Sequence, residues 1–162
     1  MSNLYKTDYT AWLGQQRELL AKRQFDQLDI DNLLEAMERR MGDEVKELRA
    51  HLVVLLVHLL KYDYQKRILK DPWVEDKVLY TWIPSINNPR REIELHVEEN
   101  PCLQPNAEEI MANVYPKAKR DAIDELNRYI KIKSKRLNKN SFPKECPWSF
   151  EQATKKNWLP GD

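Results

Sequence analysis

The sequence predicts an all-α fold: a single helical bundle of four to five main helices that spans residues 1–162, with a proline-rich connection and a C-terminal strap. Two observations carry this prediction. The 162 residues include only three glycines, and the first proline is Pro72. The residues before Pro72 are rich in Leu, Glu, Gln, Arg and Ala, which favour helices, whereas an all-β fold needs frequent turn residues that this sequence lacks.

The first two expected helices lie before Gly42. The first runs from an N-cap at Thr7 or Asp8 to about Lys22, and its inner side is expected to carry Trp12, Leu19 and Leu20. Asp29 is placed to cap the second helix, in which a spacing of four, three and four residues forms one apolar stripe of Ile30, Leu34, Met37 and Met41. Gly42 either ends this helix or lies inside one longer helix, and the sequence leaves both alternatives open.

The core of the bundle is expected at residues 45–60. Apolar positions recur there at helical spacing, and Leu52–Leu60 is apolar on nearly every side, which is typical of a helix surrounded by others. Residues 71–106 are rich in proline and are expected to be irregular, held to the core by Trp73, Trp82 and Ile83. A shorter helix is predicted from about Pro89 to Glu99.

The last long helix is expected to begin at Gln104 or Asn106 and to continue to about Leu137. Pro116 lies inside it and predicts a kink or a break. The segment after this helix is expected to be extended, and a short closing helix is then predicted by the capping-box spacing of Ser149 and Gln152.

Composition excludes several classes of protein. The 27 basic and 26 acidic side chains leave a net charge of +1, which excludes a uniformly cationic nucleic-acid coat protein and an acidic solvating chain. Cys102 and Cys146 form neither a disulfide framework nor a zinc motif and are expected to be structural thiols. Leu52–Leu60 is far shorter than the roughly 20 residues that cross a bilayer, and residues 1–25 show no signal-peptide pattern. We expect a soluble, cytoplasmic protein without membrane contact.

An ordered series of short motifs runs along nearly the whole chain. It comprises Leu4-Tyr5-Lys6-Thr7-Asp8-Tyr9, Trp12, Gln16, Phe25, Leu28-Asp29, Asp31-Asn32-Leu33, Glu35, Glu38, Met41-Gly42, Leu55-Leu56-Val57-His58-Leu59-Leu60-Lys61, Arg90-Arg91-Glu92-Ile93, Asn100-Pro101, Phe142-Pro143, Glu145-Cys146-Pro147 and Leu159-Pro160. In these residues the chain resembles domain-of-unknown-function family twenty-nine, bacterial proteins that are especially numerous in cyanobacteria. The resemblance implies a compact all-helical domain and no settled activity. Ala36-Met37 and the long stretch Asp71–Asn88 depart from the family pattern.

One group of residues is a candidate for catalysis. Three carboxylates recur at i, i+4 and i+7 on one helix face beside the apolar stripe. A carboxylate–histidine metal site or an acid–base cluster would combine these carboxylates with two residues of the central helix, and its candidate members are Asp31, Glu35, Glu38, His58 and Lys61.

Helix geometry tests this candidate cluster. If the helix continues through Gly42, Glu35 and His58 are about 35 Å apart and cannot meet. If the chain reverses at Gly42, His51 faces the acidic residues better than His58 does. We therefore expect buried polar pairing or a solvated acidic face, and we assign no metal site and no cofactor.

Two histidines have a structural and a functional interpretation. His58 lies in the most apolar run of the chain and is expected to be a neutral core histidine; the alternative is a general base whose pKa is shifted by burial and a carboxylate partner. Arg91 and His96 match the Arg-x4-His pattern of helical ribonucleases, but two residues at a loose spacing recur by chance. We expect His96→Ala to leave any activity intact.

Positive charge is concentrated near the end of the predicted last helix. Residues 117–139 hold nine basic and three acidic residues, a net charge of 9 − 3 = +6. The candidate contact residues for a nucleic acid or an acidic partner are Arg128, Lys131, Lys133, Lys135 and Arg136. A solvated helix end is the expected role. The alternatives are contact with nucleic acid, or with an acidic protein surface such as the chain's own N-terminal portion.

The absence of a catalytic motif favours a non-enzymatic protein–protein interaction or regulatory module that presents a helical face to another protein or to itself. Trp73, Trp82 and Trp158 would suit such an interface if they face solvent. A metal-dependent or nuclease-like enzyme and a nucleic-acid-binding protein remain the alternatives.

Overall fold

The computed structural model describes residues 4–70 and 78–161, and the chain divides into two compact units, Met1–Asp43 (unit 1) and Glu44–Asp162 (unit 2). The predicted all-α class is confirmed, because the described residues form helices and irregular segments without a strand. None of the described helices is both long enough and apolar enough to span a membrane. Trp73, which is expected to hold the proline-rich residues 71–106 to the core, lies outside the described residues.

Unit 1 consists of α1 (Leu4–Thr7), α2 (Tyr9–Ala21), the 3-10 turn η1 (Phe25–Gln27) and the first part of α3 (Ile30–Tyr64). The Asp8 carboxylate accepts a hydrogen bond from the backbone N–H of Ala11 at 3.0 Å, which confirms Asp8 as the N-cap of α2. The aromatic rings of α1 and α2 form a cluster of Tyr5, Tyr9 and Trp12.

Asp29 joins α2 to the start of α3. Its carboxylate accepts hydrogen bonds from the Trp12 indole N–H at 3.1 Å and from the backbone N–H of Asn32 at 3.5 Å, so the predicted cap is confirmed. The buried Gln16 side chain accepts from the Asp29 backbone N–H at 2.8 Å. The inner face of α2 is therefore formed by Trp12 and Gln16. The expectation for Leu20 is wrong, since its side chain is exposed.

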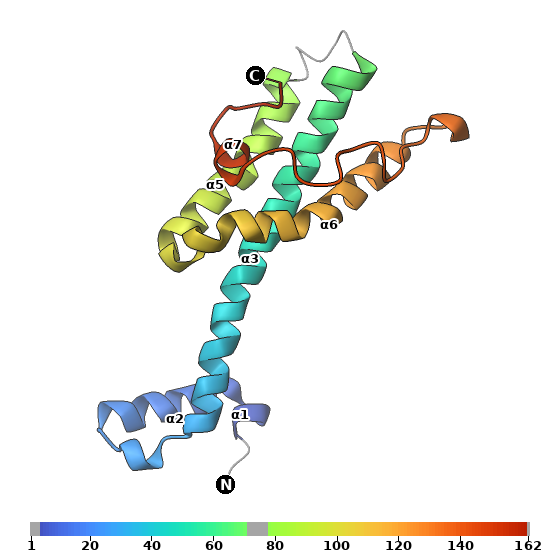
Figure 1. Ribbon diagram of the computed structural model, residues 1–162. Coiled ribbons are helices and arrows are strands. Elements are labelled where there is room, and N and C mark those ends of the chain that lie inside the picture. Colours follow the sequence, from blue (N-terminus) through green and yellow to red (C-terminus); the bar gives the residue numbers. More distant parts are fainter. Residues whose placement is uncertain (1–3, 71–77, 162) are drawn as a thin grey trace. The chain divides into compact units, whose positions relative to one another are not determined.

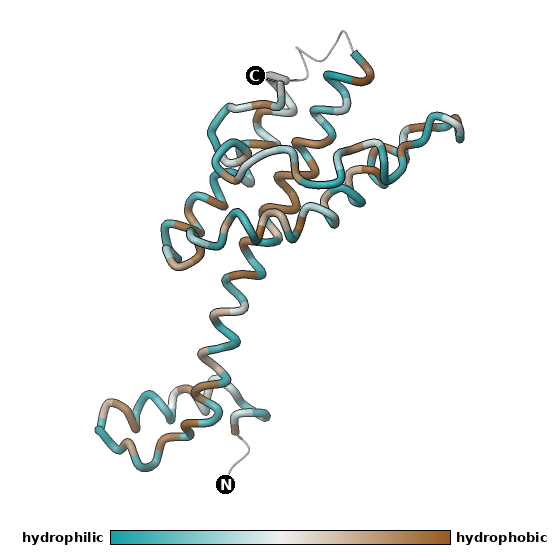
Figure 2. The backbone as a smooth tube through the Cα atoms, in the orientation of Figure 1, coloured by the Kyte–Doolittle hydropathy of each residue, from teal (hydrophilic) through white to brown (hydrophobic). Residues whose placement is uncertain are grey.

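Gly42 lies inside α3, which answers the question that the sequence left open. Nothing lies within 4 Å of the position that a Cβ would take at Gly42. The second part of α3 forms the core of unit 2, as predicted, through Leu48, Leu52, Leu55, Leu56, Leu59 and Leu60. Figure 2 shows hydrophobic positions concentrated in this part of the helix.

In unit 2, α5 (Ile83–Glu99) runs beside the second part of α3, and α6 (Ala107–Asn127) crosses it (Figure 1). The π-helical turns η2 (Gln65–Leu69) and η3 (Val78–Trp82) and the 3-10 helix η4 (Pro101–Asn106) precede and connect these helices.

The predicted start of one helix is wrong, and of the kink or break predicted at Pro116 the break does not occur. Helix α5 begins at Ile83 rather than near Pro89, and Pro89 is buried inside it. Helix α6 continues past Pro116 without a break. In both helices the proline removes only one backbone donor, while an apolar face on either side of it stays buried in the core.

The predicted end of the last helix near Leu137 is also wrong, because α6 ends at Asn127. The Asn127 side chain donates to the Leu137 carbonyl at 2.9 Å and accepts from the Leu137 backbone N–H at 2.8 Å. This pairing of two residues closes a loop that contains the 3-10 turn η5 (Lys133–Lys135). The basic residues therefore lie beyond the end of α6 and not on a long α-helix.

The C-terminal strap packs on unit 2 and contains α7 (Phe150–Thr154). Its predicted capping box of Ser149 and Gln152 is confirmed. The buried Arg90 guanidinium of α5 donates at 2.7 Å to the carbonyl of Ala153 and at 2.7 Å to that of Trp158. These bonds attach the strap to α5.

Trp82 and Trp158 take part in packing. Trp82 is buried against Tyr62, and Trp158 is half-buried against Trp148. Neither tryptophan supplies a large exposed aromatic surface.

Candidate functional site

The acidic residues predicted as a catalytic group lie exposed on α3 in unit 1. One of them, Glu35, accepts a hydrogen bond from the Arg39 guanidinium at 2.8 Å. The same guanidinium donates to the Tyr5 hydroxyl at 3.1 Å and lies 5.7 Å from the centre of the Tyr5 ring. We call Asp31, Glu35 and Glu38 the acidic row.

His58 and Lys61 belong to unit 2. The Lys61 ammonium forms an ion pair with Glu125 of α6 at 2.7 Å and lies 5.9 Å from the centre of the Trp82 ring. Burial lowers the pKa of His58, the charge of Lys61 lowers it further, and Glu125 raises it. The five candidates are therefore divided between the two units, with the acidic row in unit 1 and the other two residues in unit 2.

The apolar stripe of α3 is exposed. Its four side chains have exposed fractions of 51, 55, 60 and 67% at Ile30, Leu34, Met37 and Met41. Sequence periodicity identified these residues, but an apolar helix face is more often buried. Contiguous exposed apolar surface on a soluble domain marks an interaction site or an aggregation hazard. The exposed stripe is thus a candidate docking surface.

The small core of unit 1 makes this exposure more significant. Among the described residues of unit 1, the buried side chains are Tyr5, Trp12 and Gln16. A unit of this size rarely stabilises itself without a larger core, a cross-link or association. Unit 1 therefore buries little apolar surface within its own fold, and the apolar side chains of the stripe stay exposed.

The predicted basic contact residues lie after α6, and their side chains are exposed. We call residues 128–136 the basic loop. Tyr129 and Ile132 are exposed between its cations. In the described part of the chain, none of these cationic side chains takes part in a hydrogen bond or an ion pair. The basic loop is therefore free to contact an anionic surface.

The Arg-x4-His pair does not form one site. Arg91 is exposed and lies 3.5 Å from Glu92, whereas His96 is only 6% exposed and faces α3. The cysteines also differ. Cys146 is half-buried, and burial raises the pKa of its thiol, which fits a structural role. Cys102 is exposed on η4 instead of packed.

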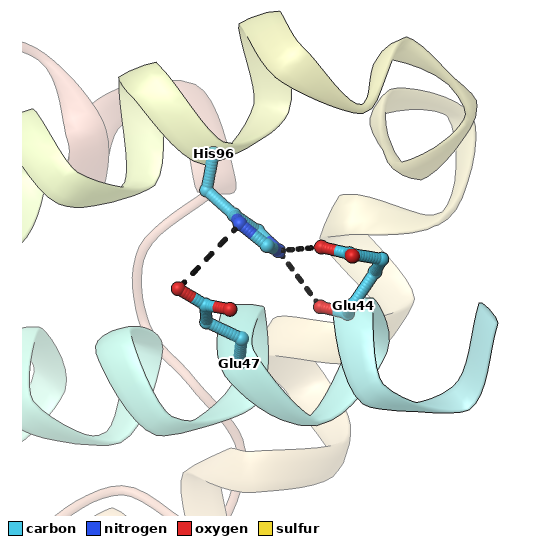
Figure 3. Close-up of side chains that lie close together, drawn as sticks. All are labelled: Glu44, Glu47 and His96. Carbon is cyan, nitrogen blue, oxygen red and sulfur yellow. Dashed lines mark hydrogen bonds and ion pairs between the residues drawn. The ribbon is translucent and has the colours of Figure 1, made fainter. Parts of the chain in front are cut away.

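His96 takes part in a cluster that sequence reasoning missed. Glu44 and Glu47 of α3 point toward the ring of His96 on α5 (Figure 3). Each of the three residues offers one metal-ligand atom, and these atoms lie within 4.8 Å of one another. The spacing of Glu44, Glu47 and His51 at i, i+3 and i+7 places them on one face of α3 and was a usable signal. The sequence carried no sign that His96 faces them.

Comparison with known proteins gives one family. The family model described as "Domain of unknown function DUF29" matches residues 4–159. No curated protein and no solved structure shows significant similarity to the sequence.

Proposed function

The chain belongs to the DUF29 family, whose description assigns no activity, and we therefore propose a function from the chain's own surfaces: it is a protein-interaction module whose apolar stripe binds an amphipathic helix of a partner protein. The observation that carries this proposal is the exposure of all four stripe residues. Burying four such side chains against a partner removes enough apolar surface from water to drive association.

The spacing of the stripe indicates the shape of the partner. Apolar residues separated by four, three and four positions match the a and d positions of a heptad, which pack against a second helix with knobs in holes. Ile30 and Met37 then occupy d positions, and Leu34 and Met41 occupy a positions. A partner helix with its own apolar stripe fits this surface.

The acidic row indicates the charge of the partner. Asp31 and Glu38 occupy e positions beside the stripe, where residues contact the flank of the other helix. In an antiparallel pair of two copies, Asp31 of one copy would face Glu38 of the other. In a parallel pair, Glu38 would face Leu33 and gain no opposite charge. A helix with basic flanks complements the row better than a second copy does.

A pair of synthetic helical peptides tests this proposal. Both carry leucine at a and d positions, and one has lysine while the other has glutamate at the flanking positions. We expect the lysine peptide to bind the full chain, and Met37→Asp to weaken that binding by at least about tenfold. Leu95→Asp is the matched control, since Leu95 is an exposed apolar residue on α5. Fluorescence anisotropy measures the affinities.

Three results would contradict the proposal. If the two peptides bind with equal affinity, the acidic row does not select the charge of the partner. If Met37→Asp and Leu95→Asp lose the same affinity, the stripe is not the binding surface. A concentration-dependent dimer in sedimentation that Met37→Asp abolishes would make a second copy the partner.

The basic loop supports a second candidate function, contact with a nucleic acid. Five exposed cations and the exposed Tyr129 offer phosphate contacts and one stacking surface. We expect affinity for single-stranded RNA to fall steeply with salt, and the variant Lys133→Gln to reduce the slope of log affinity against log salt by about 1. Lys22→Gln, at an exposed lysine of unit 1, is the control. Salt-independent binding would exclude this function.

A further inference from the structure

We propose that unit 2 binds a divalent transition-metal ion between α3 and α5, with Glu44, Glu47 and His96 as the ligand group and His51, whose Nε2 atom lies 3.7 Å from Glu47 Oε1, as an additional ligand. This site is separate from the proposed docking surface, because all four residues belong to unit 2. It rests on the positions of the side-chain atoms and on the hydrogen-bonding chemistry of His96.

The tautomer of His96 follows from its contact with Glu44. The His96 Nε2 atom lies 2.8 Å from the backbone carbonyl oxygen of Glu44. A carbonyl oxygen only accepts hydrogen bonds, so Nε2 carries the hydrogen and donates. In the neutral ring the other nitrogen, Nδ1, then presents a lone pair. Metal-binding histidines commonly have this arrangement, in which one ring nitrogen binds the ion and the other donates to a carbonyl.

In the neutral tautomer, the lone pair of His96 Nδ1 lies near the Glu47 carboxylate. The Glu47 Oε1 atom lies 3.9 Å from Nδ1, and the same oxygen lies 3.7 Å from the Nε2 atom of His51. These separations are too long for hydrogen bonds. They suit ligands of one ion, because two ligands that are each about 2.1 Å from a tetrahedral metal are about 3.4 Å apart. A cation between His96 Nδ1 and Glu47 Oε1 would replace the contact of two acceptors with two metal–ligand bonds.

The surroundings allow the ion to enter and hold the ligands in place. The Glu47 side chain is 58% exposed and that of His96 is 6% exposed. The ligand group is therefore accessible to solvent at Glu47 and buried at His96. The His51 and His96 rings lie with their centres 6.4 Å apart. The Glu44 carboxylate belongs to the same group, whose ligand atoms lie within 4.8 Å of one another.

The ligand types select the class of metal. Two imidazole nitrogens with one or two carboxylates suit Zn²⁺, Co²⁺ and related ions. Mg²⁺ and Ca²⁺ prefer oxygen ligands alone and fit this set poorly. The ion would link α3 to α5, so binding would stabilise the folded state of unit 2.

Zinc titration of the full chain, first stripped of metal with EDTA and then freed of the chelator, tests the site. We expect isothermal titration calorimetry to show one Zn²⁺ bound per chain, and Glu47→Gln to lower the affinity about ten- to a hundredfold. Glu47→Gln replaces a largely exposed side chain, so it is expected to fold. Glu92→Gln is the matched control, because Glu92 is an exposed carboxylate of α5 outside the cluster, and we expect it to bind like the wild type.

Cobalt and magnesium identify the ligands independently. Co²⁺ is expected to give visible d–d absorption bands without a sulfur charge-transfer band, and excess Mg²⁺ is expected to leave Zn²⁺ binding unchanged. Absence of Zn²⁺ binding in the wild type, equal affinity in Glu47→Gln and Glu92→Gln, or a sulfur band that places the ion on a cysteine would each overturn the proposal. So would competition by Mg²⁺ at an affinity similar to that of Zn²⁺.

Discussion

Arg90 shows how a single buried cation attaches the C-terminal strap. Its guanidinium donates to two strap carbonyls and to the Asn87 side chain, and burial lowers its pKa to about 10. At neutral pH the group therefore stays charged, and its hydrogen bonds offset the cost of burying it. The neighbouring Arg91 is exposed and offers a natural comparison.

We expect Arg90→Met to lower the free energy of unfolding of unit 2 by about 3 kcal/mol, because it leaves two carbonyl groups without their donor. Urea denaturation followed by circular dichroism measures this loss, and hydrogen exchange of residues 150–160 shows whether the strap detaches. Arg91→Met is expected to change the unfolding free energy by no more than about 0.5 kcal/mol. Equal effects of the two variants would mean that the strap is held by its apolar contacts alone.

His58 makes the stability of unit 2 depend on pH. Burial and Lys61 lower its pKa in the folded state, so between the lowered value and the unfolded value of about 6.5 the unfolded chain binds more protons. The stabilising contribution of neutral His58 is therefore complete above about pH 6.5 and is lost as the pH falls through the folded pKa.

We expect His58→Gln to flatten the dependence of the urea midpoint on pH between about 7.5 and 5. Measurements on wild type and variant at matched pH values isolate this contribution, since the carboxylates are common to both. A variant whose midpoint falls with pH as steeply as that of the wild type would show that His58 titrates normally in the folded chain.

At the scale of the element, α3 contains a glycine, Gly42, in its interior. Glycine in a helix interior costs about 0.5–1 kcal/mol relative to alanine. Because nothing lies within 4 Å of a Cβ at Gly42, alanine fits there without displacing a neighbour. Gly42 also lies next to the boundary between the two units.

We expect Gly42→Ala to slow hydrogen exchange of the α3 amides around residues 38–46 by about three- to fivefold, the equivalent of about 0.6–1 kcal/mol. Gly14→Ala in α2, where a Cβ also has open space, is the matched variant and is expected to slow exchange only in α2. Faster exchange around Gly42 in the alanine variant would show that the glycine conformation departs from that of an ordinary helix.

At the scale of the element, features that depend on neighbouring residues could be predicted from the sequence, whereas features that depend on contacts between distant residues could not. Caps at Asp8, Asp29 and Ser149 were predictable, because each depends on residues within one helical turn. The end of α6 was not, because it depends on a side-chain pairing between Asn127 and Leu137 across a loop. The candidate site shows the same limit. The stripe is a local pattern, but its exposure depends on which elements pack against it, and the meeting of His96 with α3 depends on the fold.

At the scale of the whole molecule, the two units differ in how much apolar surface they bury. Apart from Tyr5 and Trp12, the buried hydrophobic residues of the described chain belong to unit 2. Burial of apolar surface is the main favourable term in folding. Local opening is therefore expected to cost less free energy in unit 1 than in unit 2.

We expect hydrogen exchange to be faster for the amides of α2 than for those of residues 48–60, and the lysine-flanked peptide to slow exchange in α2 and in residues 30–41 without changing residues 48–60. The physical reason is linkage: a ligand that binds only folded unit 1 stabilises it in proportion to its occupancy. In Met37→Asp the same concentration of peptide is expected to slow exchange much less, in line with its weaker binding. If α2 and residues 48–60 exchange at one common opening free energy, the units unfold together, and the small core of unit 1 no longer explains why its apolar stripe needs a partner.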